Sequence, residues 1–348
     1  MKIWSCALPR PPVPSPKLLR ALAPILAAML ETPTHAGPIV AQGLRETRAF
    51  GSKERPVAGD LLLGLIRHQR ALARIDADPL TAWLRLAAEG PPDLDDPDDA
   101  YAIALSLPAE VAAEWWERLG PTEAIALAQR LAGRAPVALR VLRAPVDLPV
   151  PHRRVGALGV VLDGRANVNL LDAWREGRVE VQDLGSQAIV DFAAVTPGMR
   201  VLDLCAGAGG KSLAMAALGA RVQAWDVRPA ALVELRKRAA RVGLDVQVGP
   251  PSGHYDLILV DAPCSGTGVL RRHPENRWKL AFPTDVQTTL VQRARPHADR
   301  VVYATCSLML RENDALVRSA LGGAPMREAT VWPDADREGF YMAEILGI

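Results

Sequence analysis

The most informative segment of this sequence is Val201-Leu202-Asp203-Leu204-Cys205-Ala206-Gly207-Ala208-Gly209-Gly210-Lys211-Ser212. Its apolar start predicts a strand, its glycines and alanines predict a tight turn, and the residues after them predict a helix. Small residues let a ligand approach the backbone closely, and a helix N-terminus offers free N–H groups. Asp226 follows at the end of the next predicted strand, where a carboxylate can accept hydrogen bonds from both ribose hydroxyls. The segment therefore predicts a site for a nucleoside cofactor, and both NAD and S-adenosylmethionine fit it.

A P-loop is the competing interpretation, because Gly210-Lys211-Ser212 matches the end of that motif. A P-loop requires glycine five positions before Gly210, and this chain has Cys205 there. The sequence therefore excludes a P-loop.

Strands and helices alternate from residue 201 onward. Further strands are predicted at Val222–Trp225, Leu257–Val260 and Val301–Ala304, and helices are predicted up to Leu218 and over Pro229–Val242. Such alternation predicts a parallel sheet with helices on both faces. Ligands bind at the carboxyl ends of the strands in these sheets, so we expect the functional residues to follow directly after the strands.

Two cysteines follow predicted strands in this way, in Asp261-Ala262-Pro263-Cys264-Ser265-Gly266-Thr267-Gly268 and in Tyr303-Ala304-Thr305-Cys306-Ser307. One such cysteine would be interpreted as a small buried hydrophobic residue. Two at equivalent strand ends beside a cofactor turn indicate chemistry, which a nicotinamide-dependent oxidoreductase would leave unexplained. Carbon 5 of a pyrimidine becomes nucleophilic when a thiolate adds to carbon 6, and a second group can serve the later elimination. The attacking thiol needs a lowered pKa, for which Lys211 is the nearest cation by motif.

The residues before 201 predict a different organisation. Helical spacing after Ser15-Pro16 predicts a helix that Pro24 should kink or divide, and further helices are predicted over Pro56–Ile75, Pro108–Leu119 and Pro121–Leu131. Short runs at Val137–Leu142, Gly159–Leu162 and Val179–Gln182 predict a small α+β connecting region, and Ser186–Ala194 predicts a helix. The first 75 residues hold 11 basic and 4 acidic side chains, whereas residues 76–100 hold 1 and 8. The basic block indicates either an RNA-binding surface or a solvated face, and the acidic run Asp93–Asp99 indicates a solvated loop.

Composition bounds these interpretations. The chain has 348 residues, 49% hydrophobic and 23% charged, with a net charge of +2, which excludes a disordered chain and a histone-like polycation. The four cysteines form no CxxC pair, so we expect neither a disulfide framework nor a zinc or other metal site. The longest apolar candidate, Ala21–Leu30, is about half of what a bilayer requires, and we expect no membrane segment, no signal peptide and a cytoplasmic location.

The chain resembles the Sun/RsmB branch of the NOL/NOP/Sun family of RNA cytosine-5 methyltransferases. The resemblance rests on the segments just quoted and on Asp226, Arg271-Arg272-His273-Pro274-Glu275, Trp278, Gln182–Gln187 and Glu338–Tyr341. A weaker similarity to the NusB-like helical domain of that branch rests on Phe50–Arg55 and Arg67-His68. The resemblance implies an all-α NusB-like domain at 1–132, the connecting region at 133–180, and a Rossmann-like S-adenosylmethionine-dependent methyltransferase domain at 181–348.

The resemblance also implies roles for individual residues. Cys306 would add to carbon 6 of the base, Cys264 would assist product release, and Asp261 would lie between cofactor and base. The cofactor would be held by Asp226, by Asp261 and by the turn residues Cys205, Ala206, Gly207, Ala208, Gly209, Gly210 and Lys211. RNA contacts would come from Arg271, Arg272 and His273, for which a solvated turn is the alternative.

The chain departs from the family where relatives carry an Asp that is associated with the adenine of the cofactor, because Pro250 stands there. The implied function is methylation of carbon 5 of a cytosine in RNA by a monomer that needs no metal, with small-subunit (16S) ribosomal RNA as the favoured substrate. Transfer RNA is an alternative substrate. A non-catalytic RNA-binding or ribosome-assembly factor with a degenerate cofactor site is the alternative that Pro250 favours.

Overall fold

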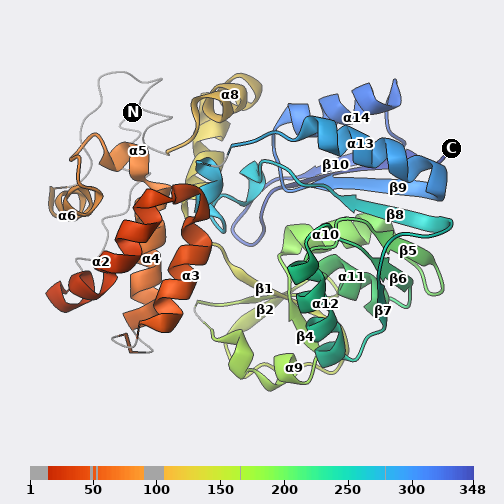
Figure 1. Ribbon diagram of the computed structural model, residues 1–348, viewed down its shortest axis with the longest axis horizontal. Helices are drawn as coiled ribbons and strands as arrows, with labels where there is room; N and C mark the ends of the chain where they lie inside the picture. Colours follow the sequence, from red (N-terminus) through yellow and green to blue (C-terminus); the bar gives the residue numbers. More distant parts are fainter. Residues whose placement is uncertain (1–14, 48–49, 52–53, 90–105, 165, 279) are drawn as a thin grey trace. The chain divides into compact units, whose positions relative to one another are not determined.

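The computed structural model describes residues 15–47, 50–51, 54–89, 106–164, 166–278 and 280–348 (Figure 1). The chain divides into a helical unit, Met1–Arg134 with Val269–Leu280, and a sheet unit, Ala135–Gly268 with Ala281–Ile348. Cys6 and the acidic run Asp93–Asp99 lie outside the described residues.

The helical unit consists of amphipathic helices that bury one apolar side each. They are α2 (Pro16–Glu31), α3 (Ala36–Glu46), α4 (Glu54–Arg67), α5 (Gln69–Leu72), α6 (Pro79–Glu89) and α8 (Ala109–Ala132). Ser15 caps α2 by accepting a hydrogen bond from the backbone of Leu18, which satisfies one of the amides that a helix start leaves unpaired. The helix continues through Pro24 without being divided there. Gly120 interrupts α8 with a positive φ of 74°, as expected from the two helices predicted on either side of it.

Val269–Leu280 packs with the helical unit although it lies far along the chain. Its short 3-10 helix η4 (Pro274–Arg277) contacts α3 and α4. Arg277 donates to the carbonyl of Leu131 at 3.0 Å, and the indole of Trp278 donates to the carbonyl of Ile66 at 3.3 Å. No local sequence pattern predicts that this segment packs with the N-terminal helices, because the pattern does not distinguish the segment from a surface loop.

The connecting region forms a four-stranded antiparallel sheet with the order β2-β3-β1-β4. Its strands are β1 (Val137–Val141), β2 (His152–Val155), β3 (Gly159–Leu162) and β4 (Val179–Val181), with α9 (Asp172–Arg175) before β4. Leu139, Val160 and Leu162 belong to a core that includes Ala173 of α9. Ala138 and Val161 point to the other face and pack with Leu184, the first residue of α10 (Leu184–Ala193).

The larger sheet has seven strands in the order β10-β11-β9-β8-β5-β6-β7. They are β5 (Arg200–Asp203), β6 (Arg221–Ala224), β7 (Val246–Val248), β8 (Tyr255–Asp261), β9 (Ala298–Thr305), β10 (Arg327–Val331) and β11 (Phe340–Leu346). β5 to β9 are parallel, but β11 is antiparallel to β9. The predicted parallel sheet is present in β5 to β9, and β11 departs from it because the chain returns from β10 without the crossover helix that a parallel neighbour requires.

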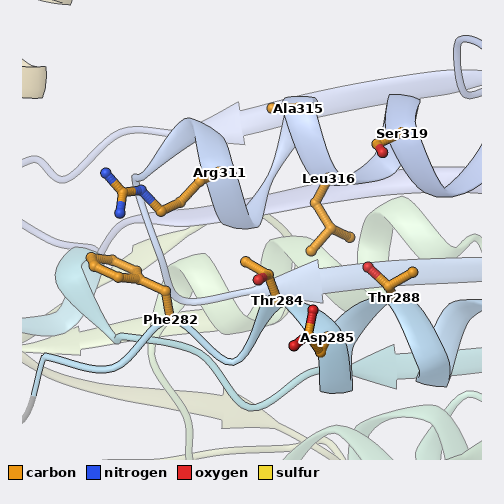
Figure 2. A pocket seen from close by; sticks show the side chains of 8 residues that line it. All are labelled: Phe282, Thr284, Asp285, Thr288, Arg311, Ala315, Leu316 and Ser319. Carbon is orange, nitrogen blue, oxygen red and sulfur yellow. The ribbon is translucent and has the colours of Figure 1, made fainter.

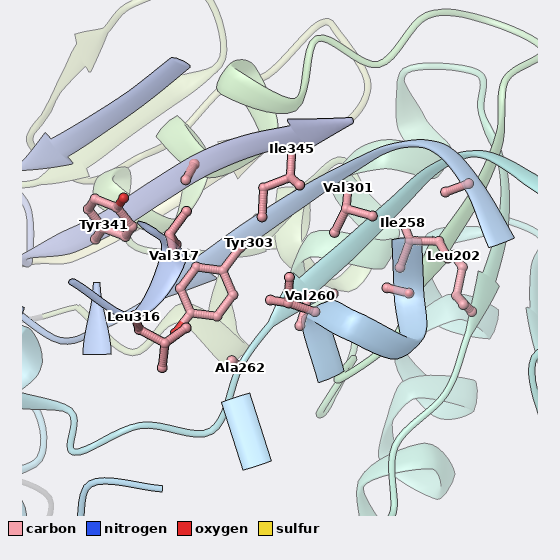
Figure 3. Close-up of a cluster of buried hydrophobic side chains, with 14 of the residues drawn as sticks. Leu202, Ile258, Val260, Ala262, Val301, Tyr303, Leu316, Val317, Tyr341 and Ile345 are labelled. Carbon is pink, nitrogen blue, oxygen red and sulfur yellow. The ribbon is translucent and has the colours of Figure 1, made fainter. Parts of the chain in front are cut away.

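Helices cover both faces of this sheet, as the alternating pattern predicted (Figure 1). On one face lie α13 (Thr284–Ala294) and α14 (Asp314–Leu321), and on the other lie α10, α11 (Gly210–Ala217) and α12 (Pro229–Val242). Figure 3 shows how Val260 and Tyr303 of the central strands meet Leu316 and Val317 of α14 in one apolar layer. This layer fixes β8 and β9, whose ends carry Cys264 and Cys306. No described helix is long and apolar enough to cross a bilayer.

Candidate active site

Three adjacent parallel strands, β5, β8 and β9, end at one edge of the large sheet. Asp203, Asp261 and Thr305 are their last residues. The β8–β9 register places Asp261 opposite Ala304, so the segments that carry Cys264 and Cys306 leave the sheet side by side. The structure thus brings together the two strand ends that the sequence singled out.

The turn after β5 is built around residues without side chains. Gly207 and Gly209 have positive φ angles of 55° and 84°, which glycine adopts without strain. A Cβ at Gly209 would lie 2.5 Å from the Leu235 side chain, so only glycine fits there. At Gly207 the nearest atom to an added Cβ would be a guanidinium nitrogen of Arg228, at 3.6 Å. The turn therefore packs tightly against α12 at Gly209 and approaches only a side-chain tip at Gly207.

Asp226 is buried directly after β6 and faces this turn. Its Oδ2 accepts the backbone N–H of Gly207 at 2.8 Å, and its Oδ1 accepts the backbone N–H of Arg228 at 2.8 Å. The Arg228 guanidinium adds hydrogen bonds of 2.9 Å to Oδ1 and 3.0 Å to Oδ2. Burial raises the pKa of Asp226, but the hydrogen bonds from Arg228 and Gly207 outweigh it, and the pKa is lowered.

Lys211 and Asp261 form an ion pair between the glycine turn and the end of β8. The Lys211 Nζ lies 2.6 Å from the Asp261 Oδ2, and the two side chains are 12% and 29% exposed. Burial acts to lower the pKa of Lys211, but the charge and hydrogen bond of Asp261 outweigh it, and the pKa is raised. The charge of a Cys306 thiolate also contributes to the raised pKa of Lys211. Lys211 is therefore a fixed cation within electrostatic reach of Cys306.

The two strand-end thiols are in direct contact. The Sγ atoms of Cys264 and Cys306 lie 3.4 Å apart. The hydrogen bond with Cys306 and burial raise the pKa of the Cys264 thiol well above its ordinary value. Cys264 is therefore held as a neutral thiol.

Cys205 has a different environment. Burial, followed by the charges of Asp261 and Asp203, raises the pKa of its thiol to about 12. A thiol with that pKa is not a nucleophile near neutral pH. This agrees with the expectation that Cys205 belongs to the cofactor turn and takes no part in bond formation.

A buried carboxylate that the sequence analysis missed connects the two cysteine segments. Glu312 accepts the backbone N–H of Ser265 at 2.9 Å and the Ser265 hydroxyl at 2.5 Å. It also accepts a hydrogen bond from Gln287 at 3.1 Å, and its carbonyl accepts the Tyr303 hydroxyl at 2.6 Å. Ser265 follows Cys264 directly, so Glu312 fixes the backbone beside that thiol. The sequence feature that could have indicated this role is the position of Glu312, an acidic residue only six positions after Cys306.

Asn313 fixes the backbone beside the other thiol, that of Cys306. The Thr305 hydroxyl donates to its Oδ1 at 2.6 Å, and its Nδ2 donates to the carbonyl of Ser307 at 2.9 Å. Asn313 thus binds the residues on both sides of Cys306. The backbone around Cys306 is held as rigidly as that around Cys264.

The proposed RNA-contacting residues lie in the helical unit. Arg271 is only 4% exposed, and its carbonyl accepts a hydrogen bond from Arg67 at 3.1 Å. The Arg271 side chain is thus buried in this structure, and its contact with RNA stays a prediction. Arg272 is half-buried and His273 is exposed, and both line a pocket beside α3 and α4. Their contact with RNA stays a prediction.

Pro250 lies just after β7, where the family has an acidic residue. Its carbonyl accepts a hydrogen bond of 2.6 Å from the Gln223 side chain. Gln223 in turn accepts the Tyr255 hydroxyl at 2.8 Å. The segment is thus anchored to β6 and β8 through its backbone.

A separate open pocket of about 610 Å³ lies between α13 and α14 (Figure 2). The Arg311 guanidinium lies over the Phe282 ring at its rim, 4.5 Å from the ring centroid. The rest is lined by one acidic residue, three hydroxyl-bearing residues and two apolar residues: Asp285, Thr284, Thr288, Ser319, Ala315 and Leu316. None of the expected site residues belongs to this pocket. Among the described residues no group of three or more His, Cys, Asp or Glu side chains could hold a metal ion.

Comparisons with known proteins agree with this geometry. Residues 192–346 match the family model described as 16S rRNA methyltransferase RsmB/F. The chain is 36% identical to ribosomal RNA small subunit methyltransferase B of Citrobacter koseri over 184 residues, which are 47% of this chain and 43% of that protein. It is 31% identical to the protein of the same name from Erwinia tasmaniensis, over 53% of this chain and 51% of that one. The chain spans about half the length of the curated relatives that it matches.

Solved structures show the same fold. The crystal structure of PH0851 has a TM-score of 0.78 at 19% identity and covers 96% of this chain and 99% of its own. A methyltransferase homolog protein from Pyrococcus horikoshii has a TM-score of 0.63 at 22% identity, over 73% of this chain and 100% of its own. The matched segment contains the glycine turn, the Lys211–Asp261 pair and both thiols. Residues 192–346 are therefore similar to the methyltransferase domain of the RsmB/F family.

Proposed function

We propose that this protein methylates carbon 5 of a cytosine in RNA, with S-adenosylmethionine as methyl donor. The observation that carries the proposal is the contact between the Cys264 and Cys306 thiols, 3.4 Å apart and at the ends of neighbouring strands. A pair of thiols next to a nucleoside site matches the chemistry that carbon 5 requires, because that carbon becomes nucleophilic only after addition at carbon 6.

The residues present fit the cofactor. The turn has no Cβ at Gly207, Gly209 or Gly210, and Asp226 lies opposite it with both oxygens directed at donors. Asp226 would hold the ribose. S-adenosylmethionine would supply an electrophilic methyl group on sulfur. Asp261, already paired with Lys211, would lie between that group and the base.

The proposed sequence of steps uses the two thiols in turn. The Cys306 thiolate would form a bond to carbon 6, and the electron pair of the carbon 5–carbon 6 double bond would form the bond from carbon 5 to the methyl carbon as the bond between that carbon and the cofactor sulfur breaks. A base would then accept the proton on carbon 5, its electron pair would form the double bond again, and the bond between carbon 6 and the Cys306 sulfur would break, returning the thiolate. Lys211 supplies a positive charge near Cys306, and Cys264, whose sulfur lies 3.4 Å from that of Cys306, would take part in proton transfer during release.

We propose small-subunit ribosomal RNA as the substrate, because the family model and the curated relatives carry that description. The target base must lie in a loop or leave its stack to reach Cys306. The helical unit, interpreted as NusB-like, would bind the RNA backbone through cationic side chains.

Incubation of purified protein with tritiated S-adenosylmethionine and protein-free 16S ribosomal RNA tests the proposal. We expect label in 5-methylcytosine, and mapping of the site would identify the nucleotide. Label in transfer RNA alone would show that the substrate is transfer RNA and that the proposed reaction is correct. Cofactor binding without label in any RNA would favour a ribosome-assembly factor that has lost the reaction.

A further inference from the structure

Arg228 caps α12 and binds Asp226 more extensively than any other residue does. It stands two positions after Asp226 and donates to it from its backbone N–H, its Nε and its Nη2, at 2.8, 2.9 and 3.0 Å. The fourth donor is the backbone N–H of Gly207 at 2.8 Å. The Arg228 side chain is 69% exposed although Asp226 is buried, so its guanidinium closes the carboxylate from the solvent side.

The four hydrogen bonds fill the acceptor capacity of this carboxylate. An ionised carboxylate offers about four lone-pair positions, two on each oxygen. Oδ1 receives the backbone N–H and the Nε of Arg228, and Oδ2 receives the N–H of Gly207 and the Nη2 of Arg228. Each oxygen therefore has one donor from the backbone and one from the guanidinium.

The difference between backbone donors and guanidinium donors determines how a ribose can bind to Asp226. The backbone donors are fixed by the turn and by the start of α12, whereas the guanidinium is on an exposed, rotatable side chain. A vicinal diol that binds a carboxylate needs one acceptor position on each oxygen. The guanidinium of Arg228 occupies one such position on each oxygen of Asp226. The same guanidinium also lies over the glycine turn, with Nη2 3.6 Å from the position of a Cβ on Gly207.

We infer that Arg228 competes with the cofactor ribose for Asp226 and sets the affinity of the site. The inference rests on the proposed use of a nucleoside cofactor. Binding of the diol exchanges the two guanidinium hydrogen bonds for two hydroxyl hydrogen bonds, and the released Arg228 side chain turns into solvent. The cost of this release lowers the observed affinity.

The expected effect is small and has a definite sign. Exposed ion pairs contribute little because solvent competes for both partners, and a bidentate arginine pair lies at the upper end of the range. Removal of the guanidinium should therefore tighten binding of a ribose-containing ligand by about two- to five-fold. A residue that contacted the cofactor favourably would give the opposite sign.

Titration calorimetry with S-adenosylhomocysteine on the full chain tests the inference. Arg228→Ala and the longer apolar Arg228→Met should both bind more tightly than the unmodified protein. Arg236→Ala is the matched control, because it removes an exposed arginine from the same helix that donates only to the carbonyl of Val248, at 3.5 Å. Its affinity should not change. Thermal unfolding should show that all the variants are folded.

The ligand provides a second control. Adenosine should gain affinity with Arg228→Ala, whereas 2′,3′-dideoxyadenosine, which lacks the diol, should not. Equal or weaker binding of S-adenosylhomocysteine by both Arg228 variants, with clear binding by the unmodified protein, would overturn the inference and leave the cofactor assignment intact. An absence of binding by the unmodified protein and both variants would overturn the cofactor assignment itself.

Discussion

The sulfur atoms of Cys264 and Cys306 lie 3.4 Å apart, close enough to share a proton. Two sulfur atoms at this distance cannot both approach carbon 6 of one base from the same side. The proposed function assigns bond formation to Cys306 and proton transfer to Cys264. The hydrogen bond with Cys306 and burial raise the pKa of Cys264, in keeping with that proposed assignment.

The first prediction concerns these two roles. Cys306→Ala should abolish methyl transfer, whereas Cys264→Ala should slow turnover by about 10²- to 10⁴-fold and accumulate a covalent RNA adduct, because elimination lacks its proton carrier. Denaturing gels with labelled RNA would reveal the adduct as a band of reduced mobility. The double variant should lose it. An adduct that survives Cys306→Ala and requires Cys264 would reverse the two roles.

The second prediction concerns the Lys211–Asp261 pair. Lys211→Met and Asp261→Asn each leave one charge without its partner, and each should cost about 1–3 kcal/mol of unfolding free energy, a range reduced because Asp261 is 29% exposed. The double variant should cost less than the sum of the two. Because the pKa of Lys211 is raised above 10.5 in the folded protein, its contribution is complete below that pH and is lost as the pH rises further.

Denaturant titrations of the single and double variants measure this coupling. Additive costs would show that the two side chains do not interact in the folded protein. Arg318→Ala with Asp314→Asn, an exposed pair on α14, is the comparison and should show little coupling.

The third prediction concerns Asp203, which is buried at the end of β5 and accepts the Ser212 hydroxyl at 2.6 Å. Burial raises its pKa to about 6. The folded protein therefore binds a proton that the unfolded chain releases near pH 3.8, and stability falls as the pH rises from about 4 through 6. Asp203→Asn should remove this pH dependence. The decrease in unfolding free energy between pH 4 and pH 7 should therefore be smaller in the variant, by at most about 3 kcal/mol. Urea unfolding of both proteins across this pH range measures it, and parallel pH profiles would contradict the assignment.

The fourth prediction concerns Glu312. Glu312→Gln keeps the shape but places an amide donor where Ser265 and Gln287 also donate, so the Cys264 segment should lose its anchor. We expect a loss of about 2–4 kcal/mol of stability and slower product release, visible as partial accumulation of the RNA adduct. Asp314→Asn, two positions away and partly exposed, should change neither. A stability loss without any adduct would assign Glu312 a purely structural role.

Much of the sheet could be predicted because buried parallel strands are short apolar runs. Val201–Leu204 and Val301–Ala304 lie within three residues of the observed bounds of β5 and β9, and α12 has the predicted bounds. β2 escaped prediction because its sequence, His152-Arg153-Arg154-Val155, has no apolar alternation. The antiparallel direction of β11 depends on the path of the chain before it, which no local pattern contains.

The site divides in a similar way. Cys264, Cys306, Lys211 and Asp261 could be identified because each stands beside a strand end or a glycine turn, and the topology brings such positions together. Glu312 could not, since its role arises from a chain reversal after Cys306. The burial of Arg271 could not be predicted, because charge in a loop usually indicates exposure to solvent, whereas here the residue is buried in the helical unit.

The assignment of Val269–Leu280 to the helical unit has a consequence for biosynthesis. The ribosome synthesises Leu131 long before Arg277. Arg277 stands 146 positions later in the chain and donates a hydrogen bond to the carbonyl of Leu131. The N-terminal helices thus leave the exit tunnel without the segment that completes them. They must wait while β1 to β8 are translated, and closing so long a loop carries an entropy cost that grows with the logarithm of its length. A fragment that ends at Arg134 consequently lacks the hydrogen bonds that Arg277 and Trp278 supply to the helical unit.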